Sequence, residues 1–506
     1  MKLKNLVSAL KGYKTFNFDN ADKIEISGIS FDSRTIKQED IFVAIKGENF
    51  DGHKHIEAAA EKGAKAIACE NSSYISNLKI PVFVVQNSRK ALAVLAAKFY
   101  DYPARKMKII GVTGTDGKTT TANLIFNILK SAGYKVGLIT SINAVIGDEI
   151  FETGFHTTTP DAVQMQKYLA EMVSANTDYA VIESSSHGLA QHRTDMCEFD
   201  VAVITNITSE HLDYHKNFND YKDAKAKLFQ SLSTNFHKNK ISKVSILNKD
   251  DVSFELLKEF KSEFQFSYGF GKTVDFSAEN IRYKNRQIHF NVQTPNQNFS
   301  IETNLLGRYN ISNILAAVAV ASSQNISKMA IQKGIKSLKK VKGRMEFIEH
   351  NSGDLEVIID FAHTVNALEN ALKAAKRFTK NKLILVFGCA GLRDKSKRKK
   401  MGEIAGKFAD KIFITAEDPR TESVEKIMNE IAKGCEISNR KENLDFWKIS
   451  DRKKAITKAI LFAEKEDLVI CCGKAQETTM CIGEKEIPWD EYKVVKFALG
   501  KRCQIN

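Results

Sequence analysis

The segment that most constrains the fold of this chain is Gly-Val-Thr-Gly-Thr-Asp-Gly-Lys-Thr, from Gly111 to Thr119. A short apolar run, Met107–Val112, precedes it and predicts a buried strand. The segment that follows, Thr119–Ala132, carries apolar residues at helical spacing. Gly133 is suited to end that helix, and Lys135–Thr140 predicts a second strand. Strand, loop, helix and strand in this order predict a βαβ unit and therefore a parallel sheet.

The chemistry of this loop indicates a bound nucleotide phosphate. Glycines let backbone N–H groups turn toward phosphate oxygens, and a helix N-terminus adds positive partial charge. Lys118 can neutralise a transferring phosphoryl group, and the Thr119 hydroxyl can bind Mg²⁺. A glycine turn without a ligand is the plain alternative, but strand, Lys-Thr pair and helix coincide here. Five residues separate Gly111 from Gly117, with Gly114 between them, where the usual phosphate loop has four, so this loop is a variant.

A chain of 506 residues is too long for one hydrophobic core, so two to four domains are expected. We delimit three α/β units at residues 1–105, 106–341 and 342–506. The predicted fold is α/β: a small first domain, a central phosphate-loop domain with a parallel sheet, and a C-terminal Rossmann-like domain. Beyond the strands around the loop, the predicted strands are Ile41–Ile45, Ile80–Val85, Tyr179–Ile182, Val201–Thr205, Val357–Asp360, Leu383–Phe387, Ile412–Thr415 and Leu468–Cys471.

The net charge of +14 allows two interpretations. A nucleic-acid binder would gather basic residues on one face with interleaved aromatics. The alternative is a lysine-rich surface with a few cations that meet anionic small substrates. The lysines are spread along the chain, and the one dense cluster is Arg393–Lys400. We therefore favour the second interpretation and expect no nucleic-acid partner.

The cysteines and the apolar segments indicate a cytoplasmic protein. None of the eight cysteines forms a CxxC pair, so neither a zinc site nor a redox motif is suggested. No apolar run approaches the roughly 20 residues of a membrane-spanning helix. Lysines interrupt the start of the chain, which lacks the apolar region of a signal peptide. We expect no membrane insertion.

Polar side chains follow two predicted strands of the central unit. Glu183 comes directly after one strand, and His211 lies in the segment after another. Ligands bind at the carboxyl ends of strands in such sheets, and Mg²⁺ prefers oxygen ligands such as a glutamate. By residue type alone, His211 could be a metal ligand or a hydrogen-bonded structural group, and Lys225 is expected to be a surface lysine.

The ordered set of motifs resembles that of the Mur ligase family, over essentially the whole chain. Each motif alone is modest evidence, but their order is specific. The resemblance is greatest to the branch that adds the third residue of the peptidoglycan stem peptide. The motifs are Asp32-Ser-Arg34, Asp40–Ala44, Asp51-Gly-His53, Thr113–Thr121, Thr157-Thr-Thr-Pro-Asp161, Glu183–Gly188, His211-Leu-Asp213, Lys225, Asn310–Asn313, Gly343–Glu346, Asp360–His363, Gly388–Lys395, Asp418-Pro-Arg420 and Gly473-Lys474.

This resemblance implies a role for each domain and for particular residues. The first domain would bind the UDP-sugar, the central domain ATP, and the third the amino acid. Lys118, Glu183, His211 and Lys225 would be catalytic. The implied ATP ligands are Gly114, Thr115, Asp116, Gly117, Lys118, Thr119, Thr120, Asn310, Arg344 and Asp360. The implied Mg²⁺ ligands are Thr119, Glu183, His211 and a carbamylated Lys225. The implied substrate ligands are Ser33 for uridine; Thr158, Thr159, Ser185, Gln191 and Arg193 for the muramoyl dipeptide; and Arg393, Asp418, Arg420, Gly473 and Glu477 for the amino acid.

The implied reaction joins a free amino acid to UDP-N-acetylmuramoyl-L-alanyl-D-glutamate. ATP converts the D-glutamyl carboxylate into an acyl phosphate, and the amine of the amino acid then displaces phosphate. Such an enzyme contributes mainly positioning and charge neutralisation, and closure of the third domain would complete the site. We expect a monomer.

The match to the family is loosest where the amino acid would bind. The family's Asp-Asn-Pro-Arg, whose Arg grips the distal carboxylate of diaminopimelate, is Glu417-Asp-Pro-Arg420 here. Gly-Lys-Gly-His-Glu is Gly473-Lys-Ala-Gln-Glu477, and Asp-Tyr-Ala-His-Thr-Pro-Asp is Asp360-Phe-Ala-His-Thr-Val-Asn366. Asp418 replaces the Asn and adds a negative charge, and two acids near this site would suit a cationic side-chain end. Meso-diaminopimelate, which ends in both an amine and a carboxylate, is the favoured amino acid, and L-lysine is the alternative.

Two other functions remain open at this point. A folylpolyglutamate synthase-like ligase has a similar ATPase core, but the Asp-Ser-Arg domain and the Thr-Thr-Thr-Pro motif argue against it. A non-catalytic Mur-like scaffold would be favoured by loss of Lys118, Glu183 or Lys225, and all three are present.

Overall fold

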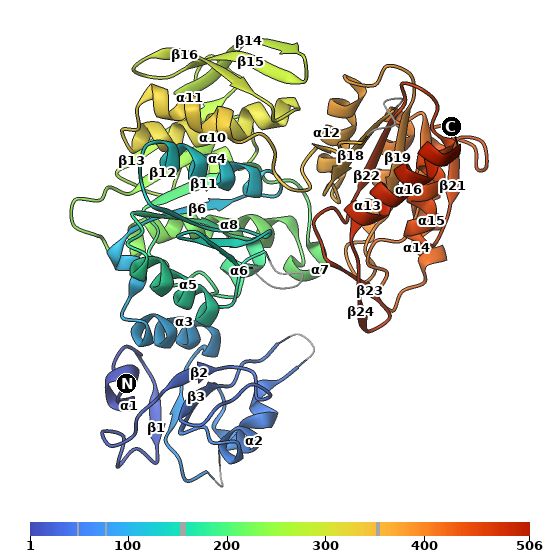
Figure 1. Ribbon diagram of the computed structural model, residues 1–506. Helices are drawn as coiled ribbons and strands as arrows, with labels where there is room; N and C mark the ends of the chain where they lie inside the picture. The colour runs from blue at the N-terminus through green and yellow to red at the C-terminus, as the bar shows by residue number, and fades with distance from the viewer. Residues whose placement is uncertain (48–49, 76–77, 152–157, 351–354, 506) are drawn as a thin grey trace.

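The computed structural model describes residues 1–47, 50–75, 78–151, 158–350 and 355–505 and contains three main sheets that follow one another along the chain (Figure 1). In this view the first sheet lies below the central one and the third lies beside it. Thr157 of the Thr-Thr-Thr-Pro motif falls outside the described residues. Within those ranges, no helix has both the length and the apolar character needed to cross a membrane.

The first sheet is small and mostly parallel, in the order β1-β5-β4-β3-β2, with β1 antiparallel to β5. Its strands are β1 Lys14–Phe16, β2 Gly28–Ser30, β3 Asp40–Val43, β4 Ala66–Cys69 and β5 Val82–Val84. The helices of this part are α1 Leu3–Val7, α2 Ile56–Glu61 and α3 Ser88–Phe99. Helix α3 ends before Tyr102-Pro103, where Tyr102 adopts a left-handed backbone (φ 48°) and Pro103 begins a short 3₁₀ turn.

The central sheet has eleven described strands, in the order β16-β15-β14-β13-β12-β11-β6-β10-β7-β8-β9. The strands are β6 Lys108–Thr113, β7 Val136–Ile139, β8 Ala144–Ile146, β9 Glu149–Phe151, β10 Tyr179–Glu183, β11 Val201–Ile204, β12 Val244–Asn248, β13 Phe264–Gly269, β14 Phe276–Lys284, β15 Gln287–Gln293 and β16 Asn298–Thr303. The helices are α4 Lys118–Ser131, α5 Ala162–Ser174, α6 Ser186–Ala190, α7 Leu212–His215, α8 Phe218–Thr234, α9 Phe254–Leu257, α10 Arg308–Ser323 and α11 Lys328–Ser337.

Strand β6 lies near the middle of this sheet, paired in parallel with β10 on one side and β11 on the other. The predicted βαβ unit and parallel sheet are confirmed, with β6, α4 and β7 in that order. Because parallel strands end at the same edge, the loops after β6, β10 and β11 lie next to one another. This edge therefore gathers the phosphate loop and Glu183.

The antiparallel strands at the two edges of the central sheet were missed in the sequence. β14, β15 and β16 pair antiparallel beyond the parallel part, and β8 and β9 do so at the other edge. In β15 alternate residues are buried, and Ile288, Phe290 and Val292 face the core. That period of two was a readable strand signal.

The third sheet is mostly parallel, in the order β17-β18-β22-β19-β20-β21, and a separate hairpin lies beside it. The strands are β17 Glu346–Phe347, β18 Glu356–Asp360, β19 Leu383–Phe387, β20 Lys411–Ile414, β21 Phe446–Lys448, β22 Leu468–Cys472 and the hairpin β23 Thr479–Ile482 and β24 Lys485–Pro488. The helices are α12 Val365–Lys376, α13 Ser396–Phe408, α14 Val424–Ile437, α15 Arg452–Phe462 and α16 Glu491–Ile505. The four strands predicted here are present.

A buried charge cluster anchors the start of β6 and β11. The Asp200 carboxylate, 1% exposed, accepts hydrogen bonds from Lys238 Nζ at 2.5 Å, Lys243 Nζ at 2.9 Å and the Ile109 backbone N at 2.9 Å. Both lysines are also buried. Asp200 thus compensates two cations that water does not reach.

We predict that Asp200→Ala lowers the free energy of unfolding by about 3–5 kcal/mol, because it strands two buried ammonium groups. The matched control is Glu171→Ala, which breaks an exposed pair with Lys167 on α5 and should cost below about 1 kcal/mol. Urea unfolding and calorimetry each measure the free energy of unfolding of the two variants. Equal loss of stability in both would contradict the assigned role of Asp200.

Candidate functional site

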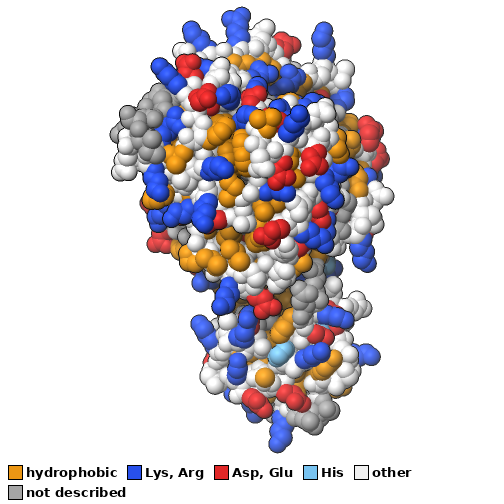
Figure 2. Space-filling view, turned by 90° about the vertical axis from the view of Figure 1, so that its right-hand side faces the viewer, with side chains coloured by type: hydrophobic (Ala, Val, Ile, Leu, Met, Phe, Trp, Pro, Cys, Tyr) orange, Lys and Arg blue, Asp and Glu red, His pale blue; other side chains and the backbone are white. Residues whose placement is uncertain are grey.

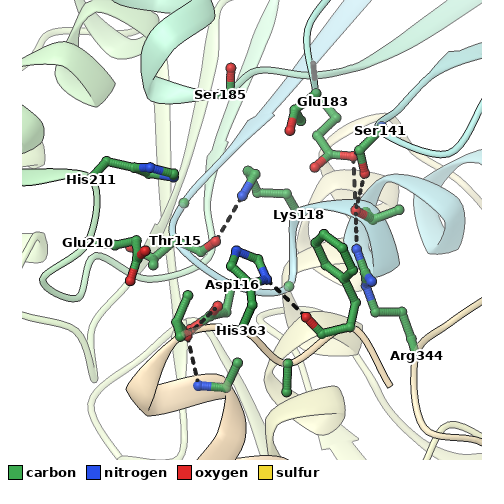
Figure 3. A pocket seen from close by; sticks show the side chains of 18 of the residues that line it. Thr115, Asp116, Lys118, Ser141, Glu183, Ser185, Glu210, His211, Arg344 and His363 are labelled. Atoms are coloured by element: carbon green, nitrogen blue, oxygen red, sulfur yellow. Dashed lines mark hydrogen bonds between the residues drawn. The ribbon is translucent and has the colours of Figure 1, made fainter. Parts of the chain in front are cut away.

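A cleft of about 550 Å³ lies between the edge of the central sheet and the third sheet. It is lined by side chains from both parts, and Figure 3 shows its interior around the phosphate loop. The structure brings most of the predicted site residues together there: Gly114, Thr115, Asp116, Gly117, Lys118, Thr119, Thr120, Thr158, Glu183, Ser185, Arg193, His211, Lys225, Arg344, Asp360, Arg393, Asp418, Arg420 and Glu477. Five predicted residues are not part of its lining: Ser33, Thr159, Gln191, Asn310 and Gly473.

The phosphate loop needs glycine at two positions. Gly114 has φ +147° and Gly117 has φ +84°, conformations that other residues rarely adopt. A Cβ on Gly114 would lie 1.8 Å from Thr205 Oγ1, and one on Gly117 would lie 2.3 Å from Asn313 Oδ1. The loop therefore packs directly on the segment after β11 and on α10, and its shape is fixed by those contacts.

Lys118, the first residue of α4, reaches back over the loop. Its Nζ donates a hydrogen bond to the Thr115 carbonyl at 2.8 Å (Figure 3). Burial lowers the pKa of Lys118, while the nearby acids Glu183 and Asp116 oppose that shift. The ammonium group is thus held at the mouth of the loop, where a phosphate would meet it.

Glu183 and Thr119 form an oxygen-rich corner beside the loop. The Thr119 hydroxyl donates to Glu183 Oε2 at 2.9 Å, and the Ser141 backbone N donates to the same oxygen at 3.0 Å. Arg344 NH2 reaches Thr119 Oγ1 at 3.4 Å from the opposite side (Figure 3). A carboxylate and a hydroxyl side by side suit a hard divalent cation, with an arginine placed for an anion.

Few other side chains are placed to bind a metal ion together with Thr119 and Glu183. Among the residues that the structure describes, no three His, Cys, Asp or Glu side chains are grouped so that they could hold a metal ion by themselves. Mg²⁺ usually binds through one or two carboxylates together with substrate phosphates and water, so a small protein ligand set is compatible with that ion.

His211 precedes α7 in a left-handed conformation (φ 57°). Its ring lies edge-on to that of His187, with centroids 4.8 Å apart. Burial, with a contribution from the nearby His187, lowers the pKa of His211 well below its usual value. The imidazole is therefore neutral at pH 7, which is the form that can ligate a metal or accept a hydrogen bond.

The expectation that Lys225 is a surface lysine was wrong. Its side chain is 1% exposed, and Nζ donates to the Gly114 carbonyl at 2.7 Å. Nζ also lies 4.5 Å from the centre of the Tyr221 ring. Helix α8 turns this residue inward, under the phosphate loop, because Tyr221, Lys225 and Phe229 lie on its buried face. Burial and the nearby Lys118 lower the pKa of Lys225 well below 10.5.

Predicted dipeptide-binding residues of the central domain form a connected group. Thr159 Oγ1 donates to the Glu183 carbonyl at 3.1 Å and lies 3.0 Å from Ser185 Oγ. Arg193 NH1 donates to the Thr159 carbonyl at 2.9 Å, and its NH2 donates to Gln191 Oε1 at 2.6 Å. Thr159 and Gln191 therefore hold cleft-lining neighbours although neither lines the cleft.

Ser33 and Asn310 lie outside the cleft lining. Ser33 is in the first domain, 7% exposed, and its carbonyl accepts from Lys62 Nζ at 2.8 Å. Asn310 is buried on α10, where its Nδ2 donates to the Leu306 carbonyl at 2.6 Å and its Oδ1 accepts from Asn313 Nδ2 at 2.9 Å. Asn313 is the residue that contacts Gly117, so Asn310 supports the loop indirectly.

Asp360 ends β18 and lines the cleft. Its carboxylate accepts from the backbone N of Met345 at 2.6 Å and of Ala362 at 2.8 Å. Burial raises its pKa, although Arg344 and these backbone donors oppose that shift. The Asp360 carbonyl accepts from the Gly473 backbone N at 3.1 Å, which places Gly473 directly behind it.

The far end of the cleft contains a buried ion-pair cluster. Lys474, whose side chain is fully buried, donates to Asp418 Oδ1 at 2.8 Å and to Glu477. Asp418 Oδ1 also accepts from the Cys481 backbone N at 3.0 Å. The Arg420 guanidinium donates through NH1 to the Gly391 carbonyl at 2.7 Å. The negative charge that Asp418 brings is thus paired with a buried cation.

The basic cluster Arg393–Lys400 is divided between internal contacts. Arg398 is fully buried and binds Glu422 and Glu430, each at 2.8 Å. Lys397 Nζ reaches Glu210 at 2.8 Å, and Arg393 lies 3.5 Å from Asp213. Figure 2 shows Lys and Arg interspersed with Asp and Glu over the face that it displays. Arg393, Lys397 and Arg398 therefore serve packing and domain contact, whereas Lys395, Lys399 and Lys400 are exposed.

The sequence did not reveal these contacts between the central and third domains. Glu210 and Asp213 belong to the central domain, whereas Lys397 and Arg393 belong to the third, so both pairs bridge the cleft. Asp116 makes a third bridge through its carboxylate. Glu417 was also given no role, although it lines the cleft and is 8% exposed. Pairing across domains leaves no local pattern in a sequence.

Comparison with known proteins identifies the class. Family profiles match in the order catalytic domain of the Mur ligase family (residues 25–100), Mur ligase middle domain (112–321) and Mur ligase glutamate ligase domain (343–475). The chain belongs to the Mur ligase family.

Individual relatives narrow the comparison. The UDP-N-acetylmuramoyl-L-alanyl-D-glutamate--2,6-diaminopimelate ligase 1 of Clostridium acetobutylicum is 38% identical over 499 residues, covering 98% of both chains. A solved structure of a UDP-N-acetylmuramoyl-L-alanyl-D-glutamate--2,6-diaminopimelate ligase has a TM-score of 0.67 at 28% identity and covers 99% of both chains. The Mycobacterium tuberculosis folylpolyglutamate synthase, solved with ADP and AMPPCP, has a TM-score of 0.63 at 17% identity but covers 76% of this chain, and it shares the fold alone.

The titration of Glu417 gives a test of the cleft's electrostatics. Burial raises the pKa of Glu417 to about 7, against the effect of the nearby Lys397. A raised carboxyl pKa favours folding of the protonated form, so this contribution is present below about pH 4.5 and is lost as the pH rises through 7. We predict that Glu417→Gln melts near the wild-type temperature at pH 5 and is more stable than wild type at pH 8, by up to about 3 kcal/mol.

Calorimetry at the two pH values measures this difference. The matched control is Glu436→Gln, a change at an exposed position of α14, which should show the same difference from wild type at both pH values. A Glu417→Gln protein that is less stable than wild type at pH 8 would show that the ionised carboxylate stabilises the fold.

Proposed function

We propose that this chain is the ATP-dependent ligase that adds the third amino acid, meso-diaminopimelate, to UDP-N-acetylmuramoyl-L-alanyl-D-glutamate in peptidoglycan biosynthesis. The observation that carries this proposal is the single cleft that joins the phosphate loop of the central domain to the charged cluster of the third domain. Full-length similarity to a diaminopimelate ligase supports the substrate. The reaction consumes ATP, so we expect it to take place in the cytoplasm, and one chain supplies every proposed ligand, so we expect a monomer.

The first chemical step occurs at the phosphate loop. A D-glutamyl carboxylate oxygen bonds to the γ-phosphorus of ATP, the bond to the β-γ bridging oxygen breaks, and ADP leaves. Lys118 and Arg344 approach the loop from two sides and would neutralise the charge on the transferring group. Backbone N–H groups from Gly114 to Thr120 would hold the phosphates. Asn310 and Asp360 would act on the ATP site from α10 and β18.

The second step forms the amide. The amine nitrogen of the amino acid bonds to the acyl carbon, the carbon–oxygen bond to the phosphate breaks, and the amine loses a proton as phosphate departs. The chain contributes by holding both reactants in one cleft and by excluding water from the acyl phosphate. Thr158, Ser185 and Arg193 would hold the dipeptide next to Glu183, and Ser33 would contact the uridine end in the first domain.

Mg²⁺ fits the corner formed by Thr119 and Glu183. The donor set there is a hydroxyl and a carboxylate only 2.9 Å apart, which is the chemistry that this ion prefers. Bound Mg²⁺ would offset the negative charge of the ATP phosphates. His211, with its neutral ring, would add a ligand from the opposite side of the loop.

Lys225 would act as a carbamate. An ammonium group cannot ligate a cation, but a neutral lysine amine can add CO₂, lose a proton and become a carboxylate. Burial lowers the pKa of Lys225 and so favours the neutral amine. The carbamate would lie beneath the Gly114 carbonyl, close to the phosphate loop.

The charged cluster of the third domain favours diaminopimelate over lysine. Asp418 would favour lysine only if its negative charge were uncompensated, but Lys474 pairs with it. Arg420 lines the cleft and suits a distal carboxylate, and Arg393, which also pairs with Asp213, belongs to the same lining. Gly473 and Glu477 lie beside the same cluster, where the amino group would bind.

The alternatives fit less well. A folylpolyglutamate synthase-like activity would leave the first domain, with its Ser33 motif, without a substrate. A non-catalytic scaffold would not need Lys118, Glu183 and Lys225 buried around one loop, since burying ionisable groups without a use costs stability.

We predict that the protein releases phosphate from ATP only when both UDP-N-acetylmuramoyl-L-alanyl-D-glutamate and a suitable amino acid are present. Meso-diaminopimelate should give a kcat/KM at least about tenfold above that for L-lysine, because only meso-diaminopimelate has a distal carboxylate that Arg420 can bind. A coupled phosphate assay with a panel of amino acids measures this. No release with any of them would contradict the ligase function, and a preference for lysine would contradict the substrate alone.

We predict that Lys225→Ala loses activity by at least about a hundredfold, because the metal corner loses a ligand. Added formate or acetate should restore part of it by replacing the carbamate. The matched control is Lys227→Ala, an exposed lysine of the same helix, which should keep its activity. Full activity of Lys225→Ala, or no response to carboxylates, would argue against carbamylation.

A further inference from the structure

Asp116 is the acidic residue of the phosphate loop, and its backbone and side chain serve different domains. Its backbone N donates to Asn206 Oδ1 at 3.1 Å, and its carbonyl accepts from Thr205 Oγ1 at 2.6 Å and Asn206 Nδ2 at 3.0 Å. These bonds fix the loop on the central sheet. The carboxylate instead crosses the cleft, where it accepts from Asn366 Nδ2 at 2.8 Å and from Thr364 Oγ1 at 3.2 Å (Figure 3).

The charges around Asp116 explain why its carboxylate points toward the third domain. A carboxylate within a phosphate loop would repel a bound phosphate if it turned inward. Here it lies instead at the N-terminus of α12, which carries positive partial charge, and beside two side-chain donors. Thr364 caps that helix, since its Oγ1 accepts from the Ala367 backbone N at 3.0 Å while its hydroxyl faces Asp116. The third domain thus adds donors and positive partial charge around a carboxylate that also lies near Lys118 of the loop.

Asn366 is the donor on which this contact depends. A carboxylate at 366 would face the carboxylate of Asp116 at hydrogen-bonding distance, and two ionised acids that close repel. In this chain the presence of Asp116 therefore requires an uncharged donor at 366.

Two hydrogen bonds of Asp360 connect the Asp116–Asn366 contact to the amino-acid end of the cleft. Helix α12 follows β18, whose last residue is Asp360, across a short connection that Asp360 fixes by accepting from the Ala362 backbone N. The Asp360 carbonyl then accepts from the Gly473 backbone N at 3.1 Å. Gly473 begins the segment that carries Lys474 and Glu477. A displacement of α12 from the loop would therefore move the amino-acid site.

We propose that Asp116 and Asn366 are positioning residues that dock the third domain on the phosphate loop, so that the amino-acid site forms only when the loop and α12 are joined. The proposal rests on the proposed ligase function for its kinetic consequences, but the docking itself does not. The pairs Glu210–Lys397 and Asp213–Arg393 bridge the same two domains and share the docking. The Asp116 contact differs from these two pairs because it originates in the loop that would hold ATP, as does the bond from Arg344 to Thr119.

The test is a reciprocal exchange. Asn366→Asp should raise the KM for the amino acid by about tenfold or more, the effect of losing one charge-assisted hydrogen bond and adding repulsion. The KM for ATP should change much less, because the loop itself is fixed by Thr205 and Asn206. Asp116→Asn should have a smaller effect, since an amide can still accept from Asn366. The double variant Asp116→Asn, Asn366→Asp restores a donor facing a carboxylate and should recover most of the wild-type KM.

Two further measurements separate loss of domain contact from a general effect of the substitution. Asn381→Asp makes the same chemical change at an exposed position of the third domain and should leave the KM unchanged. Small-angle X-ray scattering should give a larger radius of gyration for Asn366→Asp than for wild type, and recovery in the double variant. Recovery in the double variant shows that the effect of Asn366→Asp arises at its contact with Asp116.

The outcomes separate the two proposals. A double variant no better than Asn366→Asp, or an unchanged amino-acid KM and radius of gyration in Asn366→Asp, would overturn the docking role. If the wild-type protein releases no phosphate with any amino acid, the ligase function fails, and the scattering of the same variants still decides whether Asp116 and Asn366 join the domains.

Discussion

The close packing of the phosphate loop on its neighbours is the constraint on which the rest of the site depends. Gly114 approaches Thr205 and Gly117 approaches Asn313 more closely than any side chain would allow. Gly114 also presents its carbonyl to the buried Lys225. The loop is thus held by the segment after β11, by α8 and by α10 at once, and its backbone N–H groups are fixed before any ligand arrives.

Burial gives the charged groups around this loop their chemical character. It lowers the pKa of Lys118, Lys225 and His211 and raises that of Glu417. Burial thus favours the neutral forms of the His211 imidazole and the Lys225 amine more than exposure to water would. The cleft therefore obtains its proposed ligands from ordinary residue types by removing water from them.

The third domain acts on this site both by adding side chains and by closing on it. It supplies the cluster around Lys474. It also donates hydrogen bonds to acids of the central domain, as Lys397 does to Glu210. In a ligase that must protect an acyl phosphate from water, a site completed by two domains keeps the reactive intermediate enclosed. The direct link from Asp360 to Gly473 ties the ATP end of the cleft to its amino-acid end.

The sequence by itself determined the α/β class, the strand before the phosphate loop and the helix after it, because these follow from local periodicity and from glycines at fixed spacing. It also identified Lys118, Thr119 and Glu183, which lie at predictable ends of strands and helices. Only the tertiary structure decided that Lys225 is buried, that Asp418 is paired with Lys474, and that Asp116 faces Asn366. Burial and pairing depend on residues far apart in the chain that packing brings together, and local pattern carries no record of them.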